Sequence, residues 1–164
     1  MGDLQGDFKD ALASWASGVS VVACRSTSGL LYGLTVSSFA SVSLDPPLVL
    51  VCLNNANRLP GMIEAAGGFT ISILARGQDD TSNYFASRGR EPSPAFHEDH
   101  PGDWTAAGRP VIKGAAAWLC CDMHQHMPAG THTICVGRVV QASTAEGKNP
   151  LLYFRRGYRG VEGV

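Results

Sequence analysis

The sequence predicts a mainly β domain, a small barrel of about six or seven strands with short helices inserted between them. Apolar runs of strand length recur along the 164 residues and are separated by turns rich in Gly, Pro, Asn and Ser. Helical patterns are few and short, and they do not alternate with the strands as βαβ units require. A chain of this length needs only one domain.

The N-terminal part predicts a helix, a strand and a hairpin turn. Residues 19–25 (VSVVACR) have the composition of a strand, and 27–29 (TSG) that of a turn into the next strand. The helix before them is amphipathic, capped at its start by Asp7 and ended by Gly18, with an apolar side formed by Phe8, Ala11, Leu12 and Trp15.

The segment GLTVSSFASVSLDPPLVLVCL, residues 33–53, predicts two long strands with different surroundings. Strand alternation over 33–44 places Thr35, Ser37, Ser41 and Ser43 on one side. That side is either a solvated outer face or a floor of donors and acceptors for a polar ligand, and alternation leaves both open. The second strand, over 48–53, is apolar throughout, which is typical of burial on both faces.

After the loop NNAN at 54–57, the chain predicts a helix over 58–66 that two glycines close. A strand over 69–75 and a helix over 79–87 follow. Residues 88–110 are rich in Pro and Gly and have no clear period, so we expect a long loop there, a candidate for a mobile lid. The remaining expected elements are strands at 115–127 and 131–142 around a turn at 128–130, and a short strand at 151–154 before a basic tip.

Composition argues against several functional classes. The net charge is −1, 16% of the residues are charged, and no basic run alternates with aromatic residues, so we expect no nucleic-acid partner. No apolar stretch reaches membrane length, and the N-terminus does not resemble a targeting signal. The five cysteines, an odd number, lie mostly in apolar runs, which favours reduced, buried thiols and a cytoplasmic protein.

Metal-ligand residue types occur in two segments. Over 120–126, alternation places Cys120, Asp122, His124 and His126 on one side of a strand. Neighbours on one side of a strand lie about 7 Å apart, too far for all four to share an ion without a bend. The HEDH run at 97–100 lies in the Pro-rich loop, where solvated side chains are the commoner outcome. We therefore expect no metal site.

Three other side chains are candidates for ligand binding. Arg58 and Arg88 stand beside expected helix ends, and an arginine fork together with backbone N–H groups suits a phosphate. His132 begins a strand directly after a turn, which is a position at the rim of a barrel. Taken singly, each of the three is more often a structural or solvated residue. Residue patterns alone therefore indicate a polar ligand, with or without a phosphate, on a small barrel.

Four segments in a fixed order resemble a known family. They are GLTVSSFASVSLDPPLVLVCL, FASR at 85–88, AGTHTICVGRV at 129–139 and PLLYFRRGYR at 150–159. Over nearly its whole length the chain resembles the flavin reductase-like family, FMN-binding split barrels that serve as reductase components of two-component monooxygenases. The resemblance implies a split β-barrel of the FMN-binding type, a single domain over 1–164, and a homodimer with flavin near the subunit interface.

The resemblance also implies cofactors and roles for residues. FMN or FAD would be reduced by NADH or NADPH, and reduced flavin would pass to a partner monooxygenase. His132 matches a histidine near the flavin and the nicotinamide, although Thr131 replaces the usual aspartate before it. The flavin-lining segment is matched by Thr35, Val36, Ser37 and Ser38, and extended by Ser41 and Ser43. The phosphate region is matched by Asn54, Asn55, Asn57, Arg58 and Arg88, and the C-terminal signature by Tyr153 and Tyr158.

Two alternatives remain beside the diffusible-flavin reductase. The altered residues NNANR and GTH are compatible with a barrel that holds flavin or another ligand without NAD(P)H turnover. The same barrel also suits an enzyme that keeps its flavin and acts directly on an organic substrate, because one fold hosts different sites. The sequence does not choose between FMN and FAD or between NADH and NADPH.

Overall fold

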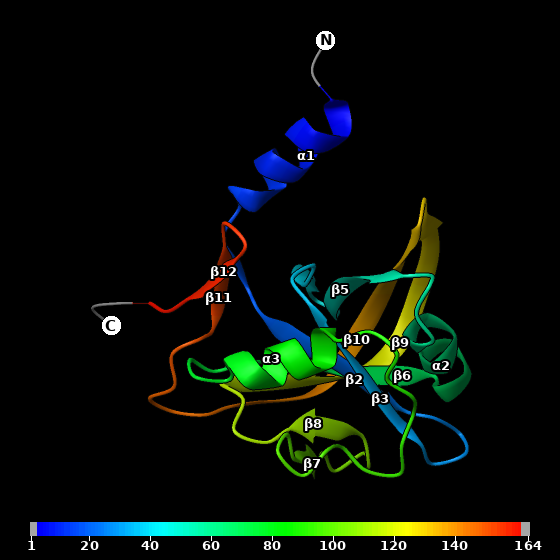
Figure 1. Ribbon diagram of the computed structural model, residues 1–164. Coiled ribbons are helices and arrows are strands. Elements are labelled where there is room, and N and C mark those ends of the chain that lie inside the picture. The colour runs from blue at the N-terminus through cyan, green and yellow to red at the C-terminus, as the bar shows by residue number, and fades with distance from the viewer. Residues whose placement is uncertain (1–2, 162–164) are drawn as a thin grey trace.

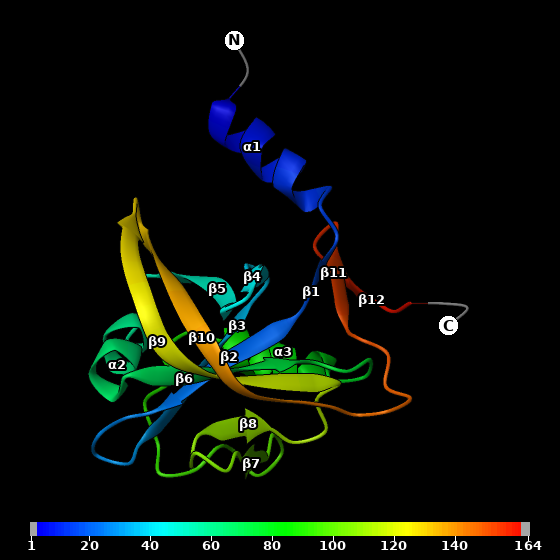
Figure 2. The ribbon, with the colours of Figure 1, turned by 180° about the vertical axis from the view of Figure 1, so that it is seen from behind.

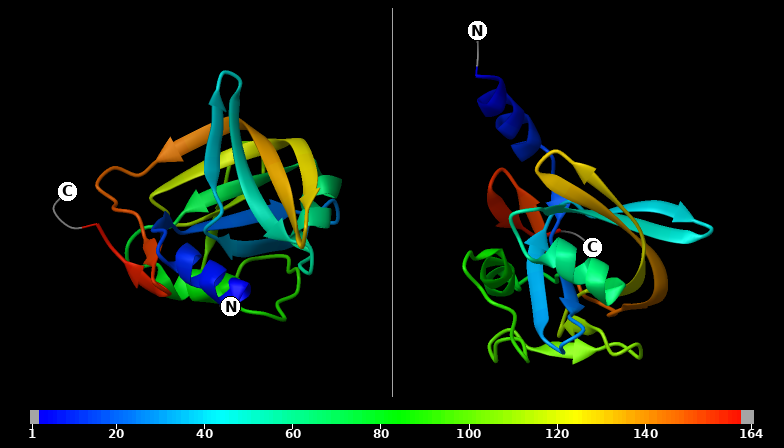
Figure 3. Two further views of the ribbon diagram at one scale, coloured as in Figure 1. Left: turned by 90° about the horizontal axis from the view of Figure 1, so that it is seen from above. Right: turned by 90° about the vertical axis from the view of Figure 1, so that its right-hand side faces the viewer.

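The computed structural model describes residues 3–161, and most of its strands form one antiparallel sheet that curls into a barrel (Figure 1; Figure 3, left). This confirms the expected mainly β barrel with short helices. In the order in which they pair, the seven strands of the sheet are β3 (Leu31–Val36), β2 (Ser20–Arg25), β6 (Gly68–Ile73), β9 (Ala117–Ala129), β10 (His132–Thr144), β5 (Pro47–Asn54) and β4 (Ala40–Leu44).

The predicted single strand over 33–44 is two strands at opposite edges of the sheet. β3 pairs with β2 and β4 pairs with β5, yet only residues 37–39 separate β3 from β4 in sequence. The chain changes direction at these three residues and crosses from one edge of the barrel to the other. Alternation therefore does not continue through the segment, and Ser41 and Ser43 do not extend the face that carries Thr35.

The barrel interior holds one continuous apolar cluster to which most strands contribute. Val22, Val51, Phe69 and Ile71 are fully buried within it. Fully burying a large apolar side chain stabilises a fold by about 1.5–3 kcal/mol. This cluster fixes the strand positions from which the site residues project.

β5 is buried on one face, not on both as its apolar run predicted. Val49, Val51 and Leu53 are buried, whereas Leu48 and Leu50 are only half-buried. The reason is the position of β5 beside the edge strand β4, where the outer face of the sheet is only partly covered. A fully apolar run does not distinguish this situation from a central strand.

Two helices cover parts of the barrel, each within a residue of its predicted span. α2 (Leu59–Ala66) buries Leu59 and Ile63 against the interior cluster and ends at Gly67, whose φ of 69° suits glycine. α3 (Asp79–Ala86) lies across β3 and buries Phe85 in a second apolar cluster that includes Leu151. The ends of these two helices bring the connecting loops to the same side of β3.

The N-terminal helix α1 (Leu4–Ala13) projects away from the barrel (Figures 1 and 2). Its cap is Asp3 and not Asp7: Asp3 Oδ1 accepts a hydrogen bond from the N–H of Gln5 at 3.1 Å, and the helix ends before the predicted Gly18. None of its side chains is buried. Its C-terminal end meets a small sheet formed by β1 (Ser17–Gly18), β11 (Leu152–Phe154) and β12 (Gly157–Arg159).

Two loop predictions need correction. Residues 88–110 include β7 (Gly102–Trp104) and reach β8 (Pro110–Ile112), and the backbones of Leu31 and Ser93 exchange hydrogen bonds of 2.7 and 3.0 Å. The turn between β9 and β10 is Gly130–Thr131, because β9 continues to Ala129, two residues past its predicted end, and β10 begins at His132. Within residues 3–161, no helix combines the length and apolarity required to cross a membrane.

Candidate functional site

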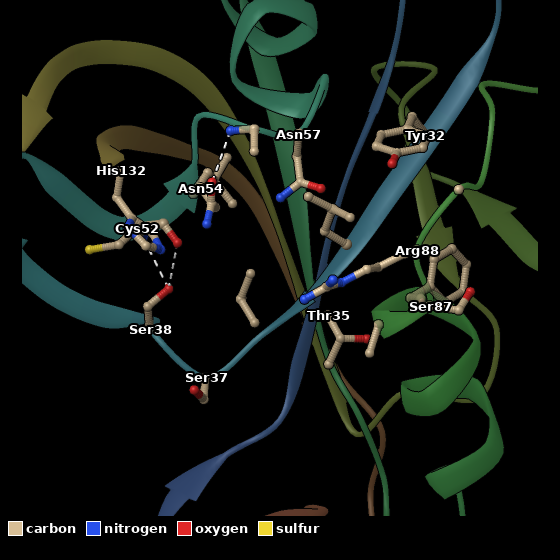
Figure 4. Close-up of a pocket in the computed structure, with 17 residues that line it drawn as sticks. Tyr32, Thr35, Ser37, Ser38, Cys52, Asn54, Asn57, Ser87, Arg88 and His132 are labelled. Carbon is tan, nitrogen blue, oxygen red and sulfur yellow. Dashed lines mark hydrogen bonds between the residues drawn. The ribbon is translucent and has the colours of Figure 1, made fainter. Parts of the chain in front are cut away.

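A cavity of about 810 Å³ lies between β3, the end of β5, the start of β10 and the C-terminal end of α3 (Figure 4). Its volume is in the range of small-molecule and cofactor sites. Sequence reasoning missed several of its lining residues, among them Tyr32, Cys52, Ser87 and Gly89. The predicted residues that line it are Thr35, Val36, Ser37, Ser38, Asn54, Asn57, Arg88 and His132.

The other predicted site residues lie outside this cavity. Ser41 and Ser43 belong to the opposite edge strand, β4. Asn55 instead connects two elements: its N–H donates to the carbonyl of Thr131 at 3.0 Å, and its Oδ1 accepts from Thr133 Oγ1 at 2.7 Å. The remaining three, Arg58, Tyr153 and Tyr158, have other partners that are described below.

Two of the predicted hydroxyls connect elements of the protein to one another. Thr35 Oγ1 donates to the carbonyl of Ser82 in α3 at 2.7 Å. Ser38 Oγ donates to the carbonyl of Cys52 at 2.9 Å and accepts from its N–H at 3.0 Å (Figure 4). Their hydrogen-bonding capacity is therefore largely used in fixing the cavity walls. The hydroxyls of Thr35 and Ser38 thus have protein partners, which the alternation pattern did not predict.

The main chain between β3 and β4 supplies donors in their place. No hydrogen bond among residues 3–161 uses the N–H of Ser37 or of Ser38. Both residues line the cavity. Backbone N–H groups left without a protein partner beside a cavity are available to a polar ligand.

The asparagine loop forms the facing wall. Asn54 Oδ1 accepts from the N–H of Ala56 at 2.8 Å, and the N–H of Asn57 donates to the carbonyl of Asn54 at 3.0 Å. These bonds make a tight turn in which the Asn54 amide is engaged. The Asn57 side chain extends toward the same space as Arg88 (Figure 4).

The two candidate arginines lie in different environments. Arg88 extends from the end of α3 toward the middle of the residues that line the cavity (Figure 4). Arg58 immediately precedes α2 and forms an ion pair with Glu91, with Arg58 Nη2 at 2.8 Å from Glu91 Oε1. Arg88 is thus placed to contact a ligand directly, whereas Arg58 is engaged beside the cavity.

A third arginine, which no sequence signal singled out, supports the wall that carries Arg88. Arg90 donates to the carbonyls of Gly33 and Phe85. Its guanidinium carbon lies 5.0–5.2 Å from the ring centroids of Tyr32, Tyr84 and Phe85. Burial lowers the pKa of Arg90. This arrangement joins β3, α3 and the segment after α3.

His132 lies on the far side of the cavity from Arg88 (Figure 4). It is the first residue of β10, directly after the Gly130–Thr131 turn, and it pairs with Asn54 of β5. Its Nδ1 is 2.9 Å from Thr131 Oγ1, so the residue that replaces the expected aspartate still contacts the ring. The turn thereby holds the imidazole at the rim, as its position in the sequence predicted.

Tyr153 and Tyr158 line a second cavity of about 360 Å³. The Tyr158 hydroxyl lies 2.9 Å from Ser82 Oγ and 2.8 Å from Asn83 Oδ1, which connects the C-terminal hairpin to α3. The two cavities share a wall, residues 35–37. The C-terminal signature therefore adjoins the predicted flavin segment from its other side.

In the segment 120–126, which raised the metal alternative, Cys120 and its neighbour Cys121 are both buried. Burial raises the pKa of the Cys121 thiol to about 12, so the thiol is protonated at neutral pH. Asp122 pairs with Arg109 at 2.8 Å, and His126 lies 3.8 Å from Glu64. Among residues 3–161, no three His, Cys, Asp or Glu side chains are grouped as metal ligands.

Comparison with known proteins identifies the family. Residues 12–162 match the model described as "Flavin reductase like domain". The chain belongs to the flavin reductase-like family. This agrees with the order of the motifs and with the cavity, which is framed by residues of that family's FASR-type and turn motifs.

Three members of the flavin reductase-like family show how far the similarity extends. The reductase component of 4-hydroxyphenylacetate 3-monooxygenase from Thermus thermophilus is 42% identical over 152 residues, 93% of each chain. The NADH-dependent flavin reductase StyB from Pseudomonas fluorescens is 34% identical over 93% of this chain and 88% of its own. The solved NADH:FAD oxidoreductase SgcE6 of Streptomyces globisporus, in complex with NAD and FAD fragments, superposes with a TM-score of 0.87 at 28% identity, covering 97% and 94% of the two chains.

The residues present fit a flavin. An isoalloxazine ring needs donors for its pyrimidine side, and Ser37 and Ser38, whose N–H groups have no protein partner among residues 3–161, line the cavity. A flavin phosphate needs a cation, and Arg88, which extends into the cavity, is of the right chemical type. Leu34 and Val36 give the cavity apolar surface suited to the flat face of a ring.

Proposed function

We propose that the protein is an NADH-dependent flavin reductase that reduces FMN in this cavity and supplies the reduced flavin to a separate monooxygenase component. The observation that carries the proposal is that one cavity of cofactor size is lined by Arg88 and by Ser37 and Ser38, whose N–H groups have no protein partner among residues 3–161. The names of its relatives favour NADH over NADPH and a monooxygenase as the partner. FAD is the alternative flavin, as in the NADH:FAD oxidoreductase it resembles.

When bound, flavin and nicotinamide supply the hydride chemistry themselves. The task of the chain is to hold the two rings together and to exclude water. The N–H groups of Ser37 and Ser38 would donate to the pyrimidine side of the ring, where negative charge grows on reduction. Arg88 would bind the phosphate, and His132 would orient the nicotinamide or cover the ring without acting as an obligatory acid.

We further propose that the protein is a homodimer. The apolar side of α1 favours this, because Leu4, Phe8 and Leu12 are 57–81% exposed on a helix that projects from the barrel, and Trp15, just after the helix, is 76% exposed. Exposed apolar surface of this extent is typical of an interaction site. Light scattering after gel filtration should give twice the chain mass, and a single-chain mass would contradict the proposal. A cytoplasmic location is favoured by five cysteines that form no disulfide.

The site is tested by replacing Arg88 with Ala. Loss of a charged contact to phosphate should weaken FMN binding about 10-fold or more, while riboflavin, which has no phosphate, should bind within about twofold of the wild type. Fluorescence titrations of both flavins measure this difference. Equal losses for the two ligands would show that Arg88 does not contact the phosphate.

The activity is tested with purified protein, NADH and free FMN, followed by loss of nicotinamide absorbance. Catalytic consumption of NADH supports the diffusible-flavin reductase. A yellow but inert protein would instead indicate a flavin-holding barrel without turnover. Activity only after an organic acceptor is added would indicate an enzyme that keeps its flavin.

A further inference from the structure

The ion pair between Arg58 and Glu91 bridges the two walls of the cavity. Arg58 directly follows Asn57, which lines one wall, and Glu91 lies two residues beyond Gly89, which lines the other. Neither charged residue itself lines the cavity. The positive charge of Arg58, one residue away from the cavity lining, is thus paired with the carboxylate of Glu91.

We propose that Glu91 competes with the flavin phosphate for Arg58, so that Arg58 is a latent phosphate ligand and Glu91 sets how tightly the protein holds FMN. The inference rests on the proposed function, because it concerns the same flavin cavity. It adds a residue, Glu91, for which neither the motifs nor the relatives suggest a role, and it assigns to this residue an effect on affinity.

Exchange of partners is energetically accessible. The Arg58 and Glu91 side chains are 61% and 65% exposed, and an exposed ion pair contributes only about 0–1 kcal/mol. A phosphate group carries about −1.5 to −2 charges and accepts bidentate hydrogen bonds from a guanidinium. The phosphate is therefore the stronger partner for Arg58, although Glu91 reduces the net gain.

The competition has a functional consequence. A reductase that supplies diffusible flavin has to release it, and a second arginine fully available to the phosphate would slow release. By occupying Arg58, Glu91 weakens the binding of phosphorylated flavin without touching the ring. Riboflavin, which lacks the phosphate, should not respond to Glu91.

The experiment compares E91Q, R58Q and the double variant, with Kd measured for FMN and for riboflavin at low ionic strength. E91Q should bind FMN about 2- to 5-fold more tightly, the range that an exposed ion pair allows, with riboflavin unchanged. R58Q should weaken FMN binding and remove the gain from E91Q, because Arg58 carries the effect. The matched control is D10N, which loses the same charge and an ion pair of the same length, Asp10 to Arg156 at 2.8 Å, on α1.

Several outcomes would overturn the inference. An E91Q variant that binds FMN with unchanged affinity, or that binds both flavins more weakly, would make the ion pair a structural tie between the walls. A gain that persists in the R58Q background would assign the effect to repulsion alone. An increase in FMN affinity in E91Q no larger than that in D10N would show that the change in net charge alone accounts for the effect. Failure of the wild type to bind any flavin would contradict the proposed function itself. An E91Q variant whose ratio of Kd values for FMN and riboflavin equals that of the wild type would contradict only the role of Glu91.

Discussion

Replacing Arg90 with Met tests whether this half-buried arginine holds the wall of the cavity together. The variant keeps the length of the side chain but removes its charge and its donors. Two hydrogen bonds from a charged donor are lost, each worth about 1.5–3 kcal/mol, together with contacts over three rings worth about 0.5–2 kcal/mol.

In the wild type, the cost of desolvating the guanidinium offsets part of the stability that these interactions provide. Arg90 Nε is also buried without a hydrogen-bond partner among the described residues. We therefore expect a net loss of about 3 kcal/mol, near the low end of values for breaking buried charged contacts. In a chain of this size, that loss lowers Tm by roughly 6–12 °C.

The assay is thermal unfolding followed by circular dichroism, with urea unfolding as a check on the free energy. Arg88→Met is the matched control, because it makes the same chemical change two residues away on a side chain that points into the cavity. It should leave Tm nearly unchanged and weaken FMN binding. An Arg90→Met variant as stable as the control would refute the view that Arg90 joins β3 to the segment after α3.

Three further predictions address the rim, the C-terminal hairpin and the buried thiols. His132→Ala should slow NADH oxidation about 10-fold while FMN affinity stays within about twofold, and unchanged turnover would remove the residue from the mechanism. Tyr158→Phe should cost about 1–2 kcal/mol by urea unfolding, because its hydroxyl contacts Ser82 and Asn83, and an unchanged midpoint would contradict that role. Burial raises the pKa of the Cys24 thiol from 9.0 to about 12, so the thiol ionises at lower pH in the unfolded chain than in the folded one. The free energy of unfolding should therefore fall as pH rises from 9 toward 12. Cys24→Ala should make this fall smaller, as measured by urea unfolding at alkaline pH.

The sequence predicted the architecture well because most elements have local signals. α2 begins after a polar loop and ends at a glycine with positive φ, and its predicted span differs from the observed one by a single residue. The break between β3 and β4 had no such signal. Residues 37–39 are Ser, Ser and Phe, so neither glycine nor proline marks a turn there. Closure of the barrel, a long-range requirement, decides that the chain turns there.

Eight of the predicted site residues line one cavity, but the predicted set also included residues with other partners. Arg58 and Arg88 look equivalent in sequence, since each stands beside a helix end. The difference comes from Glu91, which is 33 positions from Arg58 and therefore invisible to any local pattern. Arg90 was missed for the same reason. Its structural role depends on contacts with three aromatic rings and two backbone carbonyls that only the fold brings together.

The hydroxyl groups of Thr35 and Ser38 bind other parts of the protein, whereas the resemblance to the family placed both residues in the flavin-lining segment. Because Thr35 is bonded to α3 and Ser38 to β5, the chain between β3 and β4 is held at both ends. A held backbone keeps the N–H groups of Ser37 and Ser38 in fixed directions, and fixed donors stabilise developing charge better than donors that must reorient. Small side chains at these positions also let a flat ring approach the main chain. In the proposed flavin site, these hydroxyls would therefore contribute mainly by positioning the backbone.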